Sequence, residues 1–186
     1  MNPAVAIPLL TRSFYFLRHG ETDSNLRGIV AGSLDVPLTE RGYAQAHAAA
    51  RLLQKRGITE IYSSELCRAR DTANCIAELL NLTVHIVPGL GERHWGALEG
   101  QPRALRLAGV TPPGAETPEE FSERVIKALA KIKSEGIPLV VAHSGVFREL
   151  CRMLDVVYPA ERIDNARPVM CVAPTSDHPL WRLEPL

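Results

Sequence analysis

The sequence carries no net charge that could attract an anionic macromolecule. Its 21 lysine and arginine residues balance 21 aspartate and glutamate residues over a length of 186 residues. Nucleic acids and anionic membrane surfaces normally bind proteins through an excess of basic residues. We therefore expect neither nucleic acid nor a membrane as a main partner.

Long apolar runs and paired cysteines are also missing. The apolar segment over residues 4–10 is interrupted by Pro8 and follows no basic residue, so it does not fit a signal peptide and is too short for a membrane span. The four cysteines form no C-x-x-C pair and no Cys/His cluster with metal-ligand spacing. This cysteine usage predicts a reduced, cytoplasmic protein. The lack of metal-ligand spacing predicts no metal site, and we expect no other cofactor.

The remaining composition is that of a globular protein. Hydrophobic residues make up 46% of the chain and charged residues 23%, values that exclude disorder, collagen and coiled coil. A length of 186 residues fits about one domain. We expect a single domain over residues 1–186, with residues 1–12 as a flexible N-terminus and a monomer or homodimer as the assembly.

Apolar patterns predict strands and helices in alternation. Short apolar runs predict strands over residues 13–17, 60–63, 83–87 and 139–142, and two more between residues 169 and 183. Helical spacing and capping residues predict helices over residues 40–56, 64–80 and 118–134, and a fourth that ends near residue 154. In the first helix we expect Ala44, Ala48, Leu52 and Leu53 to face inward. The alternation predicts an α/β fold, a three-layer sandwich with a mainly parallel central sheet and helices on both faces.

Four polar stretches fall at the ends of predicted strands or in the loops after them. They cover residues 18–21, 63–68, 92–99 and 143–145, and each places an ionisable residue beside small or flexible ones. Ligands of such sheets bind beyond the carboxyl ends of the strands. The pattern therefore predicts one polar site, built from all four stretches.

The residue types in these stretches suit phosphoryl chemistry. The neutral imidazole of His19 could attack phosphorus, and Arg18 could neutralise the phosphoryl oxygens. Residues 143–145 precede a helix whose free N–H groups attract phosphate. Arg68 could point over the sheet edge, and Glu92 could protonate a leaving oxygen. Each residue alone has an ordinary alternative, such as a helix cap at residues 143–145, a solvated Arg68 or a loop carboxylate paired with its neighbour.

Together the stretches form an ordered pattern. It reads LRHGET at residues 17–22, SSELCRARDTA at 63–73, ERHWGALEG at 92–100 and VAHSG at 141–145. This pattern resembles the four signature blocks of the histidine phosphatase superfamily, in its phosphoglycerate-mutase-like branch. DVPLTERG at residues 35–42 and PGAET at 113–117 are similar to two further family segments. The resemblance runs from about Phe14 to Arg148 and implies a phosphoglycerate-mutase-like fold.

The resemblance also implies a role for each site residue. His19 would be the phosphorylated nucleophile, and Arg18, Arg68 and His143 would complete the phosphate pocket. Glu92 would donate a proton to the leaving group and then act as the base for water. The substrate-binding residues would be Asn25, Gly32, Ser144 and Gly145, with backbone donors at the last two. No metal is required, and the implied partner is a small phosphorylated metabolite.

Departures from the family pattern favour hydrolysis over mutase activity. Only twelve residues separate Gly100 from Pro113, and their basic residues are Arg103 and Arg106. Mutases of this branch carry a longer insertion there, which clamps the substrate and keeps water from the phospho-intermediate. The chain is therefore more similar to small phosphatases such as α-ribazole phosphatase-like or broad-specificity members, which hydrolyse phosphomonoesters.

Two alternatives remain beside a phosphatase. One is phosphoglycerate mutase-type phosphoryl transfer. The other is a non-catalytic member that binds a phospho-ligand or a protein. The joint presence of His19 and Glu92 argues against the second, because a dead site has no reason to keep both a nucleophile and a proton donor.

Overall fold

A six-stranded sheet in the order β3-β2-β4-β1-β5-β6 forms the centre of the computed structural model, which describes residues 6–157 and 163–186. The strands are β1 (Phe14–Arg18), β2 (Ile58–Ser63), β3 (Val84–Ile86), β4 (Ile137–Ala142), β5 (Pro168–Val172) and β6 (Arg182–Pro185). The pairs that link β3, β2, β4 and β1 are parallel, whereas β5 and β6 join antiparallel. The predicted, mainly parallel sheet is confirmed.

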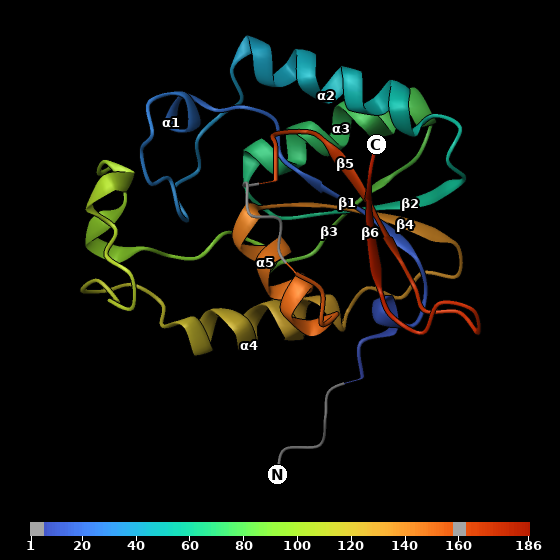
Figure 1. The fold of residues 1–186 in the computed structure, drawn as a ribbon. Coiled ribbons are helices and arrows are strands. Elements are labelled where there is room, and N and C mark those ends of the chain that lie inside the picture. The colour runs from blue at the N-terminus through green and yellow to red at the C-terminus, as the bar shows by residue number, and fades with distance from the viewer. Residues whose placement is uncertain (1–5, 158–162) are drawn as a thin grey trace.

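Helices cover both faces of this sheet (Figure 1). The helices α2 (Glu40–Leu53) and α3 (Cys67–Leu80) lie on one face, and α4 (Pro118–Leu129) and α5 (Ser144–Met153) lie on the other. Shorter elements are α1 (Asp23–Leu26) and the 3-10 turns η1 (Pro8–Thr11), η2 (Gly96–Leu98) and η3 (Arg103–Leu105). The three-layer sandwich is therefore as predicted.

Alternation along β1 explains why both faces are covered. Phe14 and Phe16 pack into the apolar cluster under α4 and α5, while Tyr15 and Leu17 pack into the cluster under α2 and α3. Successive side chains of a strand point to opposite faces, so a wholly buried strand needs apolar residues at every position. All five residues of β1 are buried; the first four are apolar or aromatic, and the fifth is Arg18, at the edge where the strand ends.

Two helix predictions need correction. In α2 the buried positions are Gly42, Ala46, Ala49, Ala50 and Leu53, whereas Ala44, Ala48 and Leu52 are exposed. Alanines occur on several sides of this helix, so the spacing of apolar residues alone did not identify its inner face. Ser64 does not cap α3, which begins at Cys67. The Ser64 hydroxyl instead accepts from Leu66 N, and Cys67 N donates to the Asp35 carboxylate at 2.6 Å.

The N-terminal prediction is also corrected in part. Residues 1–5 lie outside the described residues. Pro8–Thr11 form the turn η1, and Leu9 within it is buried in the core, so a flexible terminus does not describe this segment. Across the described ranges, no helix is long and apolar enough to cross a membrane.

Candidate active site

Strand register brings two histidines together at one edge of the sheet. Arg18, the last residue of β1, pairs with Ala142, the last residue of β4. His19 and His143 follow these two residues directly, and their rings lie 5.2 Å apart between centroids. The carboxyl ends of parallel strands therefore bring together the two histidines that the sequence predicted for one site.

The backbone fixes the orientation of His19. Its Nδ1 lies 2.7 Å from the carbonyl oxygen of Gly20. A carbonyl oxygen only accepts, so Nδ1 carries the proton in the neutral ring and Nε2 keeps its in-plane lone pair. The Gly20 peptide is itself held, because its N–H donates to the Thr72 hydroxyl at 2.9 Å. His19 is thus a buried imidazole in the tautomer that makes Nε2 a nucleophile.

His143 is buried more deeply and stays neutral. Burial lowers the pKa of its imidazole well below the ordinary 6.5, and the positive charges of Arg68 and Arg18 lower it further. Its Nε2 lies 2.9 Å from the Ser64 hydroxyl, while its Nδ1 is buried with no hydrogen-bond partner among the described residues. If the hydroxyl donates to Nε2, the Nδ1–H can donate to an anionic oxygen.

Two buried arginines flank the histidines. Arg68 is 1% exposed and donates to the carbonyl oxygens of Gly32 and Leu34, each at 2.7 Å. Arg18 is also buried and donates to the carbonyl of Ile163 at 2.9 Å. Burial lowers the pKa of Arg68, but a guanidinium remains charged at neutral pH. Charges held in this way attract a dianion such as a phosphoryl group.

Arg68 reaches this position differently from the prediction. Because α3 starts at Cys67, Arg68 is the second helical residue rather than one turn inside. Its guanidinium is fixed by the loop that contains Gly32. That glycine has φ 55°, and a Cβ there would collide with the Glu99 carboxylate, so an L side chain does not fit.

Glu92 reaches the site from the opposite wall. Its Oε2 accepts from Gly145 N at 3.0 Å and from the Ser144 hydroxyl at 3.4 Å, and its Oε1 accepts from Arg93 N at 2.9 Å. The alternative of a Glu92 paired with the Arg93 side chain is therefore wrong, since the contact is to the backbone. A Cβ on Gly145 would collide with the Glu92 carboxylate.

The helix start after β4 also differs from expectation. The N-cap residue of α5 is His143, and Ser144 is the first helical residue rather than the cap. The Gly145 N–H, expected as a phosphate donor, donates to Glu92 instead. Ser144 and Gly145 do line the cavity.

Asn25 lines the same cavity, and the capping box at the start of α1 holds its side chain. Its side-chain oxygen accepts from Thr22 N at 3.2 Å and from Asn165 Nδ2 at 3.1 Å. Both contacts use the oxygen, so the amide nitrogen is the group that can donate to a ligand. Asn165 also donates to the His19 carbonyl at 2.9 Å, which ties Asn25 to the backbone of His19.

Most of these side chains line one cavity of about 210 Å³, whereas His143 is fully buried and is not among its lining residues. The predicted site residues that line it are Arg18, His19, Asn25, Gly32, Arg68, Glu92, Ser144 and Gly145. No group of three or more His, Cys, Asp or Glu side chains in the described parts of the chain is arranged to hold a metal ion. The arrangement can bind a phosphoryl dianion, attack it with an imidazole nitrogen and offer a carboxyl group to the departing oxygen.

Comparison with known families agrees with this geometry. Residues 14–171 match the model of the histidine phosphatase superfamily, branch 1. The chain belongs to this superfamily.

Proteins with different named activities are similar in sequence or structure to this histidine phosphatase superfamily chain. It is 37% identical to agropine synthesis reductase of Rhizobium rhizogenes over 90% of its own length and 40% of that protein, so it spans about two fifths of this relative. It is 35% identical to the probable phosphoglycerate mutase GpmB of Yersinia pestis (strain Pestoides F), over 69% of this chain and 68% of that one. The solved structure of a mycobacterial glucosyl-3-phosphoglycerate phosphatase matches with a TM-score of 0.78 and 29% identity, covering 94% of this chain and 97% of that one.

Arg148 and Phe121 line the cavity and were not found from the sequence. Arg93, Trp95, Arg103 and Arg106, from the segment over residues 93–112, line it as well. Arg148 lies one helical turn after Ser144, so the helical repeat could have placed it there. The guanidinium carbons of Arg106 and Arg93 lie 3.6 Å and 4.4 Å from the Trp95 ring centroid. No local pattern in the sequence signals this stack.

Proposed function

We propose that the protein is a metal-independent phosphatase that hydrolyses a small phosphomonoester through a phosphohistidine on His19. The observation that carries the proposal is the Nδ1 contact of His19 with the Gly20 carbonyl at 2.7 Å. It leaves Nε2 as the attacking nitrogen, in a cavity that is also lined by two buried arginines, which can balance the charge of a phosphoryl group.

The reaction proceeds in two transfers. His19 Nε2 attacks phosphorus, the bond to the leaving oxygen breaks, and Glu92 gives that oxygen a proton, so that an alcohol departs. Glu92 then takes a proton from water as the water attacks the phosphohistidine. The P–N bond breaks, inorganic phosphate leaves, and both residues return to their starting states.

Each remaining pocket residue has a proposed task. Arg18 and Arg68 neutralise the phosphoryl oxygens as charge spreads over them. His143 donates from Nδ1, and Asn25 donates from its amide nitrogen. The substrate is a small phosphorylated metabolite, whose leaving group faces the wall formed by Trp95 and its neighbouring arginines.

The arginine-rich wall also supports a second candidate, a phosphoglycerate mutase-type transfer. Arg93, Arg103, Arg106 and Arg148 line the cavity in addition to the two arginines of the phosphate pocket. They could hold a second anionic group of a substrate that receives the phosphoryl group back. Release of inorganic phosphate from a panel of phosphomonoesters, against movement of the phosphoryl group within one substrate, separates the two activities.

The test of the nucleophile is His19→Ala. We expect turnover to be abolished while circular dichroism and the melting temperature stay close to those of the wild type. Wild-type protein quenched during turnover should carry acid-labile, base-stable phosphate. His47→Ala, which changes an exposed histidine on α2, is the matched control and should keep full activity. Retention of more than a few per cent activity in His19→Ala would contradict the proposal.

A further inference from the structure

A partly buried ion pair contacts the backbone of the loop that carries Glu92. Arg124, from α4, donates from Nε to Glu116 Oε1 and from Nη2 to Glu116 Oε2, both at 2.7 Å. The two side chains are only 29% and 21% exposed. This fork-to-carboxylate geometry fixes both partners more firmly than a single contact does.

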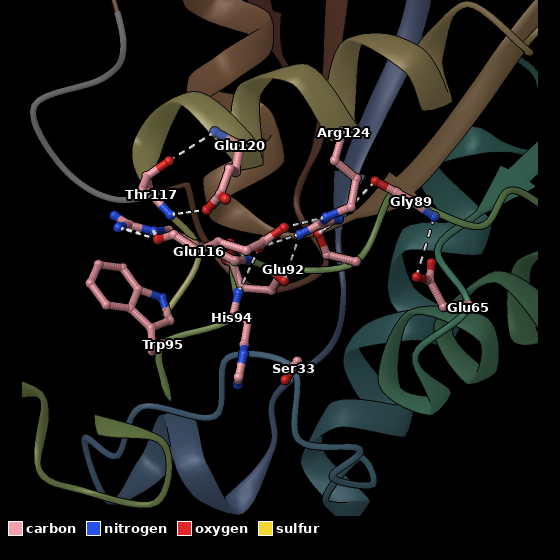
Figure 2. A network of polar contacts seen from close by, with 12 residues as sticks. Ser33, Glu65, Gly89, Glu92, His94, Trp95, Glu116, Thr117, Glu120 and Arg124 are labelled. Carbon is pink, nitrogen blue, oxygen red and sulfur yellow. Dashed lines mark hydrogen bonds and ion pairs between the residues drawn. The ribbon is translucent and has the colours of Figure 1, made fainter. Parts of the chain in front are cut away.

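Arg124 uses its remaining donors on the backbone before and at Glu92. Its Nη1 donates to the carbonyl oxygens of Gly89 at 2.9 Å and Gly91 at 3.1 Å, and its Nη2 also donates to the Glu92 carbonyl at 3.3 Å. Figure 2 shows this guanidinium between Glu116 and the Gly89 loop. One side chain therefore holds three carbonyls in a segment of irregular backbone.

Glu116 holds the backbone on the other side of Glu92. Its Oε2 accepts from His94 N at 2.9 Å, and its carbonyl accepts from Arg93 Nε at 2.9 Å and Arg93 Nη2 at 2.6 Å. The pKa of Glu116 is lowered: burial would raise it, but the hydrogen bonds from Arg124 and His94 N outweigh burial. The carboxylate is thus charged at neutral pH and keeps its ion pair with Arg124. We call this pair, Arg124 and Glu116, the clamp.

We propose that Arg124 and Glu116 are positioning residues that hold Glu92 in place for transfer of its proton to the leaving group. The inference rests on the proposed function. A proton donor must lie within hydrogen-bond reach of the departing oxygen, and Glu92 belongs to a segment that is itself neither helix nor strand. The clamp supplies that support from α4. Its two charges cancel, so it orients the carboxyl group without adding net charge to the pocket.

The test compares two leaving groups in single-turnover experiments with the protein in excess. β-Glycerol phosphate has an alkoxide leaving group that needs a proton, whereas the phenolate of p-nitrophenyl phosphate scarcely does. The variants Arg124→Lys and Glu116→Gln keep much of the side-chain volume but break the fork. We expect each variant to lower the single-turnover rate of β-glycerol phosphate cleavage by about 10- to 100-fold. The rate with p-nitrophenyl phosphate should fall by less than about threefold.

Two control variants set the upper and lower limits of the expected effect. Glu92→Gln should show a larger difference in rate loss between the two substrates than the clamp variants do. Lys127→Gln removes an exposed ion pair with Glu123 on the same helix, and it should change neither rate. Thermal unfolding identifies any variant that has lost its fold, and the other clamp variant then carries the test.

The outcomes separate the inference from the proposed function. Suppose that Glu92→Gln is selective for the alkoxide leaving group. Equal losses with both substrates in the clamp variants, or no loss with either substrate, would then overturn the positioning role. If the wild type forms no phosphohistidine, or if Glu92→Gln is not selective, the proposed function itself fails. Selective loss in both clamp variants supports the inference.

Discussion

Replacing Gly145 by alanine tests the placement of Glu92 without removing any functional group. Gly145 is the second residue of α5, where alanine is well suited to the helix. Its Cβ would collide with the Glu92 carboxylate and lie 3.2 Å from Phe121 Cζ. The carboxylate is the end of a flexible side chain, so we expect it to move while the helix stays in place.

The expected change in stability is small. Displacing the carboxylate breaks the 3.0 Å bond from Gly145 N, and a bond to a charged group contributes about 1.5–3 kcal/mol. Water in the cavity can replace part of this loss. Alanine also restricts the unfolded chain, which stabilises the protein by about 0.4–1 kcal/mol. We expect the free energy of unfolding in urea to fall by no more than about 2 kcal/mol.

The expected loss of activity is much larger. A displacement of about 1 Å in a catalytic group can cost about 100-fold in rate. We therefore expect Gly145→Ala to slow single-turnover release of glycerol from β-glycerol phosphate by about 100-fold. Release of p-nitrophenol should slow by less than about 10-fold, because that leaving group scarcely needs the proton.

A double-mutant cycle decides whether the effect passes through Glu92. If it does, Gly145→Ala should add almost nothing once Glu92→Ala is present, because the displaced group is already gone. Fully additive losses, or a Gly145→Ala variant with wild-type rates, would refute the reasoning.

Three further outcomes are expected. Activity should survive prolonged treatment with EDTA, because arginines balance the phosphoryl charge; a loss that magnesium restores would contradict this. Arg106→Ala should raise KM more for substrates with a second anionic group than for neutral ones, because Arg106 lines the cavity beside Trp95; an equal rise would exclude that role. The lowered pKa of Glu116 means that its ionised form stabilises the fold above the ordinary 4.5 and that this contribution is lost as pH falls through the lowered pKa. In urea titrations the stability difference between wild type and Glu116→Gln should therefore shrink on acidification, and a constant difference would count against the ion pair.

Strand ends were the part of the site that the sequence could predict well. His19 and His143 each follow a buried apolar run, and the rule that parallel strands present their carboxyl ends at one edge brings them together. Arg18 needed no further information, because it is the residue before His19. The family resemblance then added roles that no spacing rule could supply.

Contacts between loops were beyond that reasoning. The use of the Gly145 N–H by Glu92 depends on how a long irregular segment folds back onto α5. The start of α3 depends on a carboxylate 32 residues away, since Asp35 accepts from Cys67 N. Capping preferences consider only neighbours in sequence, so they placed the start at Ser64.

The central position of β1 has a consequence for how the chain folds. β1 is synthesised before both of its partners in the sheet, which lie far along the chain at β4 (Ile137–Ala142) and β5 (Pro168–Val172). Strand pairings over such sequence separations form late, because the entropy of closing a large loop is lost before the strand contacts contribute favourable free energy. The edge that brings His19 beside His143 therefore cannot form in a nascent chain until β4 has left the ribosome. Ribosome-bound chains that end before β4 should leave the aromatic strand β1 unpaired and depend on chaperones to keep it from aggregating.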